Sequence, residues 1–256
     1  MIQVVVLVVG LPLIYLLSRA LKVQSKPIPI ADSKKEVILA SLVIVVMFFL
    51  VLVWRAWMHM SQLDLRSAYY VDLVDMSAML ILYIPVLLVV AVVMKRSGQS
   101  LESIGVTGKD RGRMLALGLA ISAIFVTISG LLAPSLGQGF VGFSPSLAYG
   151  LVLFAINGFS EEVVWRGYVQ TRLTAYSGKL AGLVVASLLF AVLWHFPVAY
   201  YVETSGVVLE ALAWATLRVV PGLLFGYLMS KSQNIIPSSV FHFFWNWNLL
   251  LWQQSL

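Results

Sequence analysis

The amino-acid sequence predicts an all-α membrane protein that crosses the bilayer several times. Of its 256 residues, 61% are apolar and only 11% are charged, and the mean hydropathy is +0.95. Soluble domains usually carry about a quarter of charged residues. Several apolar runs approach the roughly 20 residues that a helix needs to cross the hydrocarbon core. Because backbone polar groups in lipid must be satisfied within their own segment, each run is expected to be a helix.

Eight hydrophobic segments follow one another along the chain, and we expect them to form a single membrane domain. The first is expected to be a retained span, since it lacks the basic leading region and clear cleavage site of a signal peptide. The first four, within residues 1–133, carry no recognisable motif, whereas the last four, with their core in residues 146–250, carry the polar residues described below. The eight segments are residues 2–18, 37–54, 73–94, 114–133, 146–176, 179–198, 208–229 and 235–253.

The lysines and arginines are distributed unevenly between the two sides of these spans. Fourteen of the 17 lie on one side, Arg55 and Arg66 lie on the other, and Arg218 lies inside the seventh span. The positive-inside rule predicts that the crowded side is cytoplasmic and that both termini are outside. The net charge of +6 therefore indicates topology rather than nucleic-acid binding, since no long basic tract is present. The fourteen are Arg19, Lys22, Lys26, Lys34, Lys35, Lys95, Arg96, Lys109, Arg111, Arg113, Arg166, Arg172, Lys179 and Lys231.

Two adjacent acids, Glu161 and Glu162, interrupt the fifth segment two residues after the uncharged run AYGLVLFAING. Ionisable residues within a span are costly and by default indicate function. Arg166 follows Glu162 by four residues, which is the spacing of an ion pair on one helix face. Such a pair would keep Glu162 ionised while Glu161 transfers protons. The alternative is that the acids mark the membrane–water boundary and that Arg166 extends to the surface.

Two histidines and an asparagine in the later segments are expected at the same depth as these acids. Glu161 lies sixteen residues before Ser177, and His195 lies seventeen residues after Gly178. Two antiparallel helices would place both about 25 Å from the turn. In the last segment, His242 and Asn246 are four residues apart and share one helix face. The alternatives are structural: His195 as a helix-end cap, and the last pair as contacts between helices.

Residue types of this kind suit the hydrolysis of an acyl group by water. A carboxylate can act as a general base, and a neighbouring imidazole can share the activation of water. A second imidazole and an amide can donate hydrogen bonds to an oxyanion. The chain has no cysteine, which excludes a thiol nucleophile. Glu161, His195 and His242 would also satisfy a catalytic zinc site, but no HExxH motif is present, so we favour chemistry without a metal or cofactor.

Three short motifs in this half resemble those of a known family. EEVVWR, residues 161–166, matches EExxxR, and FHFFWN, residues 241–246, contains HxxxN. The stretch FAVLWHFP resembles FxxxH, except that Phe190 precedes His195 by five residues instead of four. Over roughly residues 146–250 the chain thus resembles the CPBP family, the CAAX-protease and bacteriocin-processing group of intramembrane proteases.

The resemblance implies a membrane-embedded endopeptidase of about eight helices around a cavity that opens to the cytoplasm. It implies that Glu161 and His195 activate water and that His242 and Asn246 form the oxyanion hole. Glu162 and Arg166 would support them. The expected partners are membrane lipid and a membrane-anchored or lipidated peptide or protein substrate, and these residues leave the prenylation of that substrate open.

A protein without catalytic activity is the main alternative. A scaffold or immunity-type protein would bind a membrane partner and use the same polar cluster as structure. A transporter with a proton relay is less favoured, because the sequence shows no pair of broken helices in repeated halves. A protease requires Glu161 and His195, whereas a scaffold should tolerate their replacement.

Overall fold

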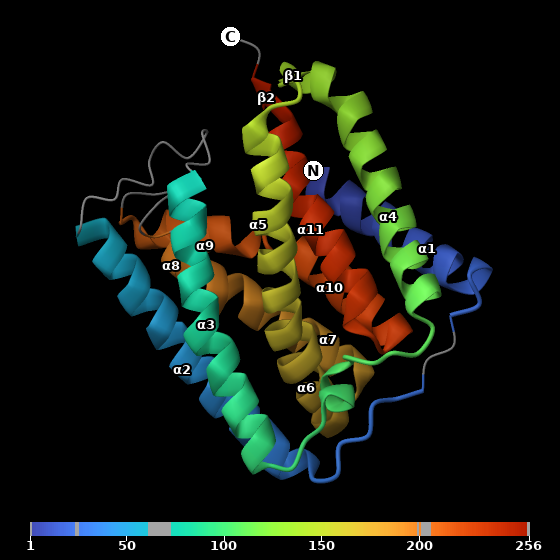
Figure 1. The fold of residues 1–256 in the computed structure, drawn as a ribbon, viewed down its shortest axis with the longest axis vertical. Coiled ribbons are helices and arrows are strands. Elements are labelled where there is room, and N and C mark those ends of the chain that lie inside the picture. Colours follow the sequence, from blue (N-terminus) through green and yellow to red (C-terminus); the bar gives the residue numbers. More distant parts are fainter. Residues whose placement is uncertain (1, 24–25, 61–72, 199, 201–205, 255–256) are drawn as a thin grey trace.

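The protein is built almost entirely of long helices, as the sequence predicts. A computed structural model describes residues 2–23, 26–60, 73–198, 200 and 206–254 (Figure 1). Within these residues, five helical segments are long and apolar enough to cross a membrane, and Val5–Ala20 is a shorter apolar helix. The all-α membrane class is therefore confirmed. The expected number of eight spans is only approximate, because five of the described helical segments meet the criteria of length and apolar composition. The five segments are Ser33–Trp57, Arg111–Leu136, Leu147–Ser177, Lys179–Pro197 and Val208–Ser232.

The order of the elements follows the hydrophobic segments. The first half comprises α1 (Ile2–Ala20), α2 (Ser33–Met60), α3 (Leu73–Arg96), η2 (Leu101–Ile104), α4 (Arg111–Leu132), η3 (Ala133–Leu136) and β1 (Gln138–Phe140). The second half comprises α5 (Pro145–Glu162), η4 (Val163–Gln170), α6 (Thr171–Ser177), α7 (Lys179–Leu189), η5 (Phe190–Trp194), α8 (His195–Val198), α9 (Val208–Thr216), α10 (Val219–Ser232), α11 (Ile235–Leu251) and β2 (Trp252–Gln254).

Polar side chains set the start of two helices that matter for the site. Ser144 precedes α5, and its hydroxyl accepts a hydrogen bond from the Leu147 amide at 3.3 Å. Pro145 occupies the first helical position, where its missing N–H is not needed. Asn234 precedes α11 and accepts from the Ile236 amide at 2.8 Å. These caps satisfy backbone donors that the helices themselves leave free.

Three predicted segments differ from single α-helices. Residues 146–176 and 179–198 each contain a π-helical stretch, η4 and η5, in which hydrogen bonds run from residue i to i+5. The seventh segment is divided at residues 217–218 into α9 and α10. The spacing of apolar residues in the sequence does not reveal the π-helical stretches, because one inserted residue leaves the apolar pattern almost unchanged.

The central helix of the bundle is α11, which packs against α4 and α5. Figure 1 shows α2 and α3 together on one side, and α1 and α4 on the other. Helix α1 also packs against α10, and α3 packs against α5. Strand β1 pairs antiparallel with β2, with Gly139 opposite Gln253. The motif-free helices α1 to α4 thus share interfaces with the motif-bearing helices.

The cation distribution needs two corrections. Arg166 and Arg172, counted among the fourteen charges of the crowded side, are fully buried inside the protein. Arg55, expected in an outside loop, is a buried residue of α2, while Arg66 lies outside the described residues. The other twelve cations of the crowded side are exposed or partly exposed. The charge bias therefore persists, and the cytoplasmic orientation of that side stays a prediction.

A close backbone approach at Gly167 gives a test of the helix packing. A β-carbon at this residue of η4 would lie 2.7 Å from the Ile104 carbonyl oxygen of η2. We expect Gly167→Ala to reduce the free energy of unfolding by about 1–3 kcal/mol, because a backbone atom must move. Gly112→Ala in α4 is the control, since its β-carbon would meet nothing within 4 Å. Equal melting temperatures of the two variants in detergent would contradict this packing.

Candidate active site

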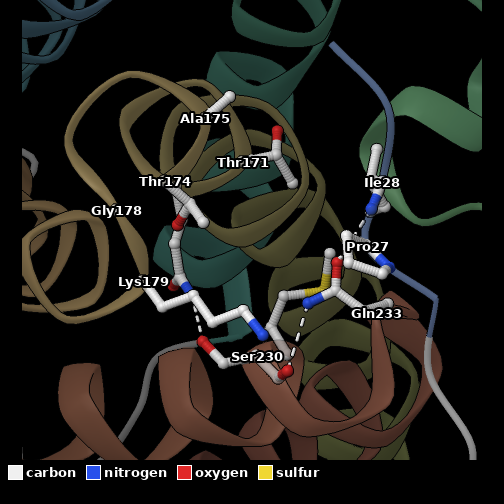
Figure 2. A pocket seen from close by; sticks show the side chains of 11 residues that line it. Pro27, Ile28, Thr171, Thr174, Ala175, Gly178, Lys179, Ser230 and Gln233 are labelled. Carbon is white, nitrogen blue, oxygen red and sulfur yellow. Dashed lines mark hydrogen bonds between the residues drawn. The ribbon is translucent and has the colours of Figure 1, made fainter.

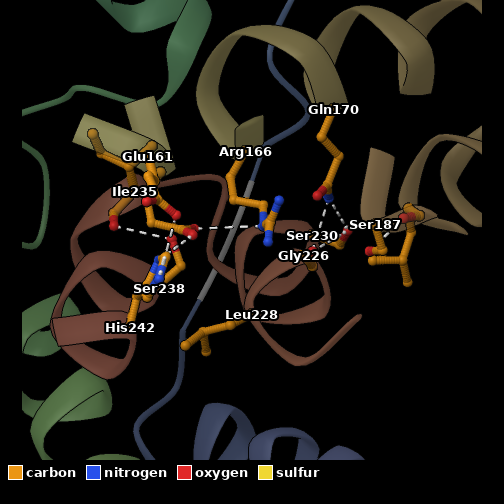
Figure 3. Close-up of polar contacts among 12 residues, drawn as sticks. Glu161, Arg166, Gln170, Ser187, Gly226, Leu228, Ser230, Ile235, Ser238 and His242 are labelled. Atoms are coloured by element: carbon orange, nitrogen blue, oxygen red, sulfur yellow. Dashed lines mark hydrogen bonds and ion pairs between the residues drawn. The ribbon is translucent and has the colours of Figure 1, made fainter. Parts of the chain in front are cut away.

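The two acids of the EExxxR motif lie where α5 ends and the π-helix η4 begins. Both are buried, with 5% of Glu161 and none of Glu162 exposed. His242 of α11 faces both of them (Figure 3): its Nδ1 is 3.0 Å from Glu162 Oε1, and its Nε2 is 3.6 Å from Glu161 Oε2. The imidazole also stacks on Phe225, with the ring centres 4.4 Å apart. Helices α5 and α11 of the motif-bearing half thus place one imidazole between two carboxylates.

Arg166 forms the expected pair with Glu162. Its Nε lies 3.6 Å from Glu162 Oε2, and its guanidinium lies 4.4 Å from the centre of the Phe190 ring. The side chain is completely buried, and within the described part of the chain its nitrogens make no hydrogen bond. The ion pair with Glu162 and the face of the Phe190 ring therefore stabilise the buried charge of Arg166. The alternative in which Arg166 extends to the membrane surface is wrong.

The π-helical turn η5 explains the unusual spacing of the FxxxH-like motif. His195 directly follows η5, and its Nδ1 lies 3.1 Å from the Phe190 carbonyl oxygen. The two rings meet edge to face, with centres 4.6 Å apart. One turn of a π-helix brings residues i and i+5 together, as an α-helix does for i and i+4. The extra residue between Phe190 and His195 is therefore absorbed by the wider turn, and the two side chains still share a face.

His195 lies beside the acid cluster without joining it directly. Among the described residues, no hydrogen bond or ion pair connects His195 with Glu161 or His242. The Phe190 ring borders both imidazoles, at 4.6 Å from His195 and 6.1 Å from His242 between ring centres. His195 thus lies in the neighbourhood of the cluster, and the Phe190 ring contacts both histidines.

Asn246 reaches the acids through a residue that sequence reasoning did not single out. Its Nδ2 donates to Asn157 Oδ1 at 2.8 Å, and Asn157 Nδ2 donates to Glu161 Oε1 at 2.9 Å. Asn157 precedes Glu161 by four residues in an otherwise apolar run, so its position on the same helix face was a usable signal. Tyr83 of α3 also contacts Glu161, and nothing in the sequence distinguishes it from the other nine of the ten tyrosines.

The alternative zinc site is not supported by the arrangement of the side chains. In the described ranges, no three His, Asp or Glu side chains are placed to hold one metal ion. His242 faces Glu161, whereas no contact joins His195 to either of them among the described residues. The absence of a metal requirement stays a prediction, for which cleavage in the presence of a chelator is the test.

A cavity of about 220 Å³ is lined by residues of α6, the start of α7 and the end of α10, together with Pro27 and Ile28 (Figure 2). Its polar lining groups largely bond one another: Gln170 donates to Ser230 at 3.0 Å, and Gln233 donates to the Ser230 carbonyl at 3.1 Å. None of the six residues singled out from the sequence lines it. We therefore assign no step of the chemistry to this cavity.

Comparison with known families agrees with the motifs. A family model described as type II CAAX prenyl endopeptidase, Rce1-like, matches residues 143–248. The matched segment contains all six predicted site residues and Asn157, but it does not reach Tyr83. The predicted resemblance to CAAX-type intramembrane proteases is confirmed over this segment. No curated protein and no solved structure matched the chain.

Proposed function

Since residues 143–248 match the Rce1-like family of type II CAAX prenyl endopeptidases, we propose that this protein is an intramembrane, glutamate-dependent endopeptidase. It would hydrolyse a peptide bond of a membrane-anchored or lipidated substrate near the cytoplasmic face. One observation carries the proposal: His242 contacts both Glu161 and Glu162, and all three side chains are buried within the matched segment.

Glu161 is the proposed general base. It accepts a proton from water while the hydroxide adds to the carbonyl carbon, and the proton then passes to the leaving amine nitrogen. His195 is suited to help orient that water. Because its Nδ1 faces a carbonyl oxygen, which can only accept, Nδ1 carries the hydrogen and Nε2 keeps its lone pair.

His242 and Asn246 are the proposed oxyanion donors. Glu162 lies beside Nδ1 and orients the imidazole, so that Nε2 is the nitrogen proposed to donate to the developing oxyanion. Asn246 Nδ2 has two hydrogens, and its contact with Asn157 uses one of them. Arg166 balances the charge of Glu162 and so holds the acid that orients His242.

A non-catalytic membrane scaffold is the second candidate. The mutual contacts of Glu161, Glu162, His242, Asn157 and Asn246 are also what a purely structural polar core requires within a helix bundle. A scaffold and a protease differ in one measurable respect: only the protease loses its function when the proton-transferring groups are replaced and the fold is kept.

The first experiment is cleavage of a panel of prenylated and unprenylated membrane-anchored peptides by the purified protein in liposomes. We expect cleavage to continue in a strong chelator, and His195→Ala to reduce the rate by about 10²–10⁴-fold. Melting temperatures of wild type and variant control for folding. Activity that is lost in chelator and restored by zinc would make this a metalloenzyme. If no peptide is cleaved and His195→Ala keeps full function in cells, the scaffold replaces the protease.

A further inference from the structure

Tyr83 lies on α3, outside the segment that matches the family, yet it contacts the proposed general base. Its hydroxyl donates to Glu161 Oε1 at 2.6 Å, a short distance typical of a hydrogen bond to a charged acceptor. Only 2% of Tyr83 is exposed, and its ring stacks on Trp194 with centres 5.9 Å apart. The packing of α3 against α5 therefore fixes where this hydroxyl points.

Asn157 completes the contact from the same helix as the acid. Its Nδ2 donates to Glu161 Oε1 at 2.9 Å and also to the Tyr83 hydroxyl. Its Oδ1 accepts from Asn246. The donors and acceptors are consistent, because the Tyr83 hydroxyl gives its one hydrogen to Glu161 and accepts from Asn157.

The two oxygens of Glu161 are therefore in different surroundings. Oε1 receives hydrogen bonds from Tyr83 and Asn157, whereas Oε2 faces His242 Nε2 across 3.6 Å. At that distance the two groups form no direct hydrogen bond, so Oε2 keeps its lone pairs available for a water molecule. Because Oε1 is already occupied by two donors, Oε2 is the oxygen that can receive a proton from that water.

We propose that Tyr83 and Asn157 are positioning residues, which hold Oε1 of Glu161 so that Oε2 faces the water to be activated. The proposal rests on the proposed protease function and extends it to a helix outside the matched segment. Asn157 also links the base to Asn246, so one amide aligns the proton acceptor and one of the oxyanion donors. The motif-free half of the chain thus contributes part of the active centre.

The test is Tyr83→Phe, which removes the hydroxyl and keeps the ring on Trp194. We expect kcat to fall about 10- to 100-fold, as for loss of a hydrogen bond to a charged group, with KM within about twofold and an unchanged melting temperature. Tyr176→Phe is the matched control, because Tyr176 is 55% exposed on α6. In a Glu161→Gln background, Tyr83→Phe should cause no further loss, since the base that it positions is already absent.

The outcomes separate this proposal from the proposed function. If the wild type cleaves peptide and Tyr83→Phe keeps its kcat, the positioning role is wrong while the protease stands. A change confined to KM, or a loss matched by a lower melting temperature, would likewise assign Tyr83 to packing. If the wild type cleaves nothing, infrared spectra decide: the carboxyl band that disappears in Glu161→Gln should shift in Tyr83→Phe but not in Tyr176→Phe. An unshifted band overturns the proposal.

Discussion

Glu161→Gln is expected to reduce peptide cleavage by about 10²–10⁴-fold while the protein stays folded. The amide has the shape of the carboxylate, and its oxygen can still accept from Tyr83 and Asn157 at the Oε1 position. It cannot accept a proton from water at neutral pH. The change therefore removes the base and preserves most contacts of the side chain. The measurement is kcat in liposomes with the best peptide of the panel.

The control for this variant is Glu102→Gln, a substitution of the same kind at an exposed residue of η2. It should leave kcat unchanged, because Glu102 lies outside the buried cluster. Cleavage by Glu161→Gln within a few fold of the wild-type rate would show that another group activates the water. In that event His195, whose Nε2 keeps a lone pair, would be the next candidate for the base.

Arg172→Ala is expected to lower the free energy of unfolding by about 3–5 kcal/mol, because it leaves a buried acid without its partner. Arg172 is fully buried, and its Nε lies 3.4 Å from Glu36 Oε2 of α2. Its guanidinium also donates to the Ser103 carbonyl at 2.8 Å and lies 4.3 Å from the centre of the Tyr168 ring. One side chain thus joins α2, η2 and α6 at the cation-rich end of the bundle.

Two further variants make this prediction specific. Arg113→Ala removes an arginine whose pair with Asp110 is about half exposed, so its cost should be at most about 1 kcal/mol. The double variant Glu36→Met/Arg172→Met should be more stable than Arg172→Ala, since no charge is left buried alone. Melting temperatures in detergent compare the three. A melting temperature of Arg172→Ala equal to that of Arg113→Ala would contradict the buried network.

Local features of the sequence were sufficient for the class of the protein and for part of the site. Long apolar runs predict membrane helices because the bilayer imposes both their length and their internal hydrogen bonding. The pairing of Glu162 with Arg166 was also predictable, since four residues along a helix bring two side chains to one face. The same reasoning placed His242 and Asn246 on a common face of the last helix.

Tertiary packing decided the contacts that turn these residues into a candidate site. His242 meets Glu162 across 80 positions of sequence, Tyr83 meets Glu161 across 78, and Arg172 meets Glu36 across 136. The helical repeat specifies which residues of one segment share a face, but it does not specify which faces of different helices meet. That choice depends on the combined packing of the whole bundle, and two π-helical turns in the middle of it also rotate the residues that follow. For this reason the acids, histidines and asparagine could be named from the sequence, whereas the tyrosine on α3 that orients the first acid could be found only in the folded structure.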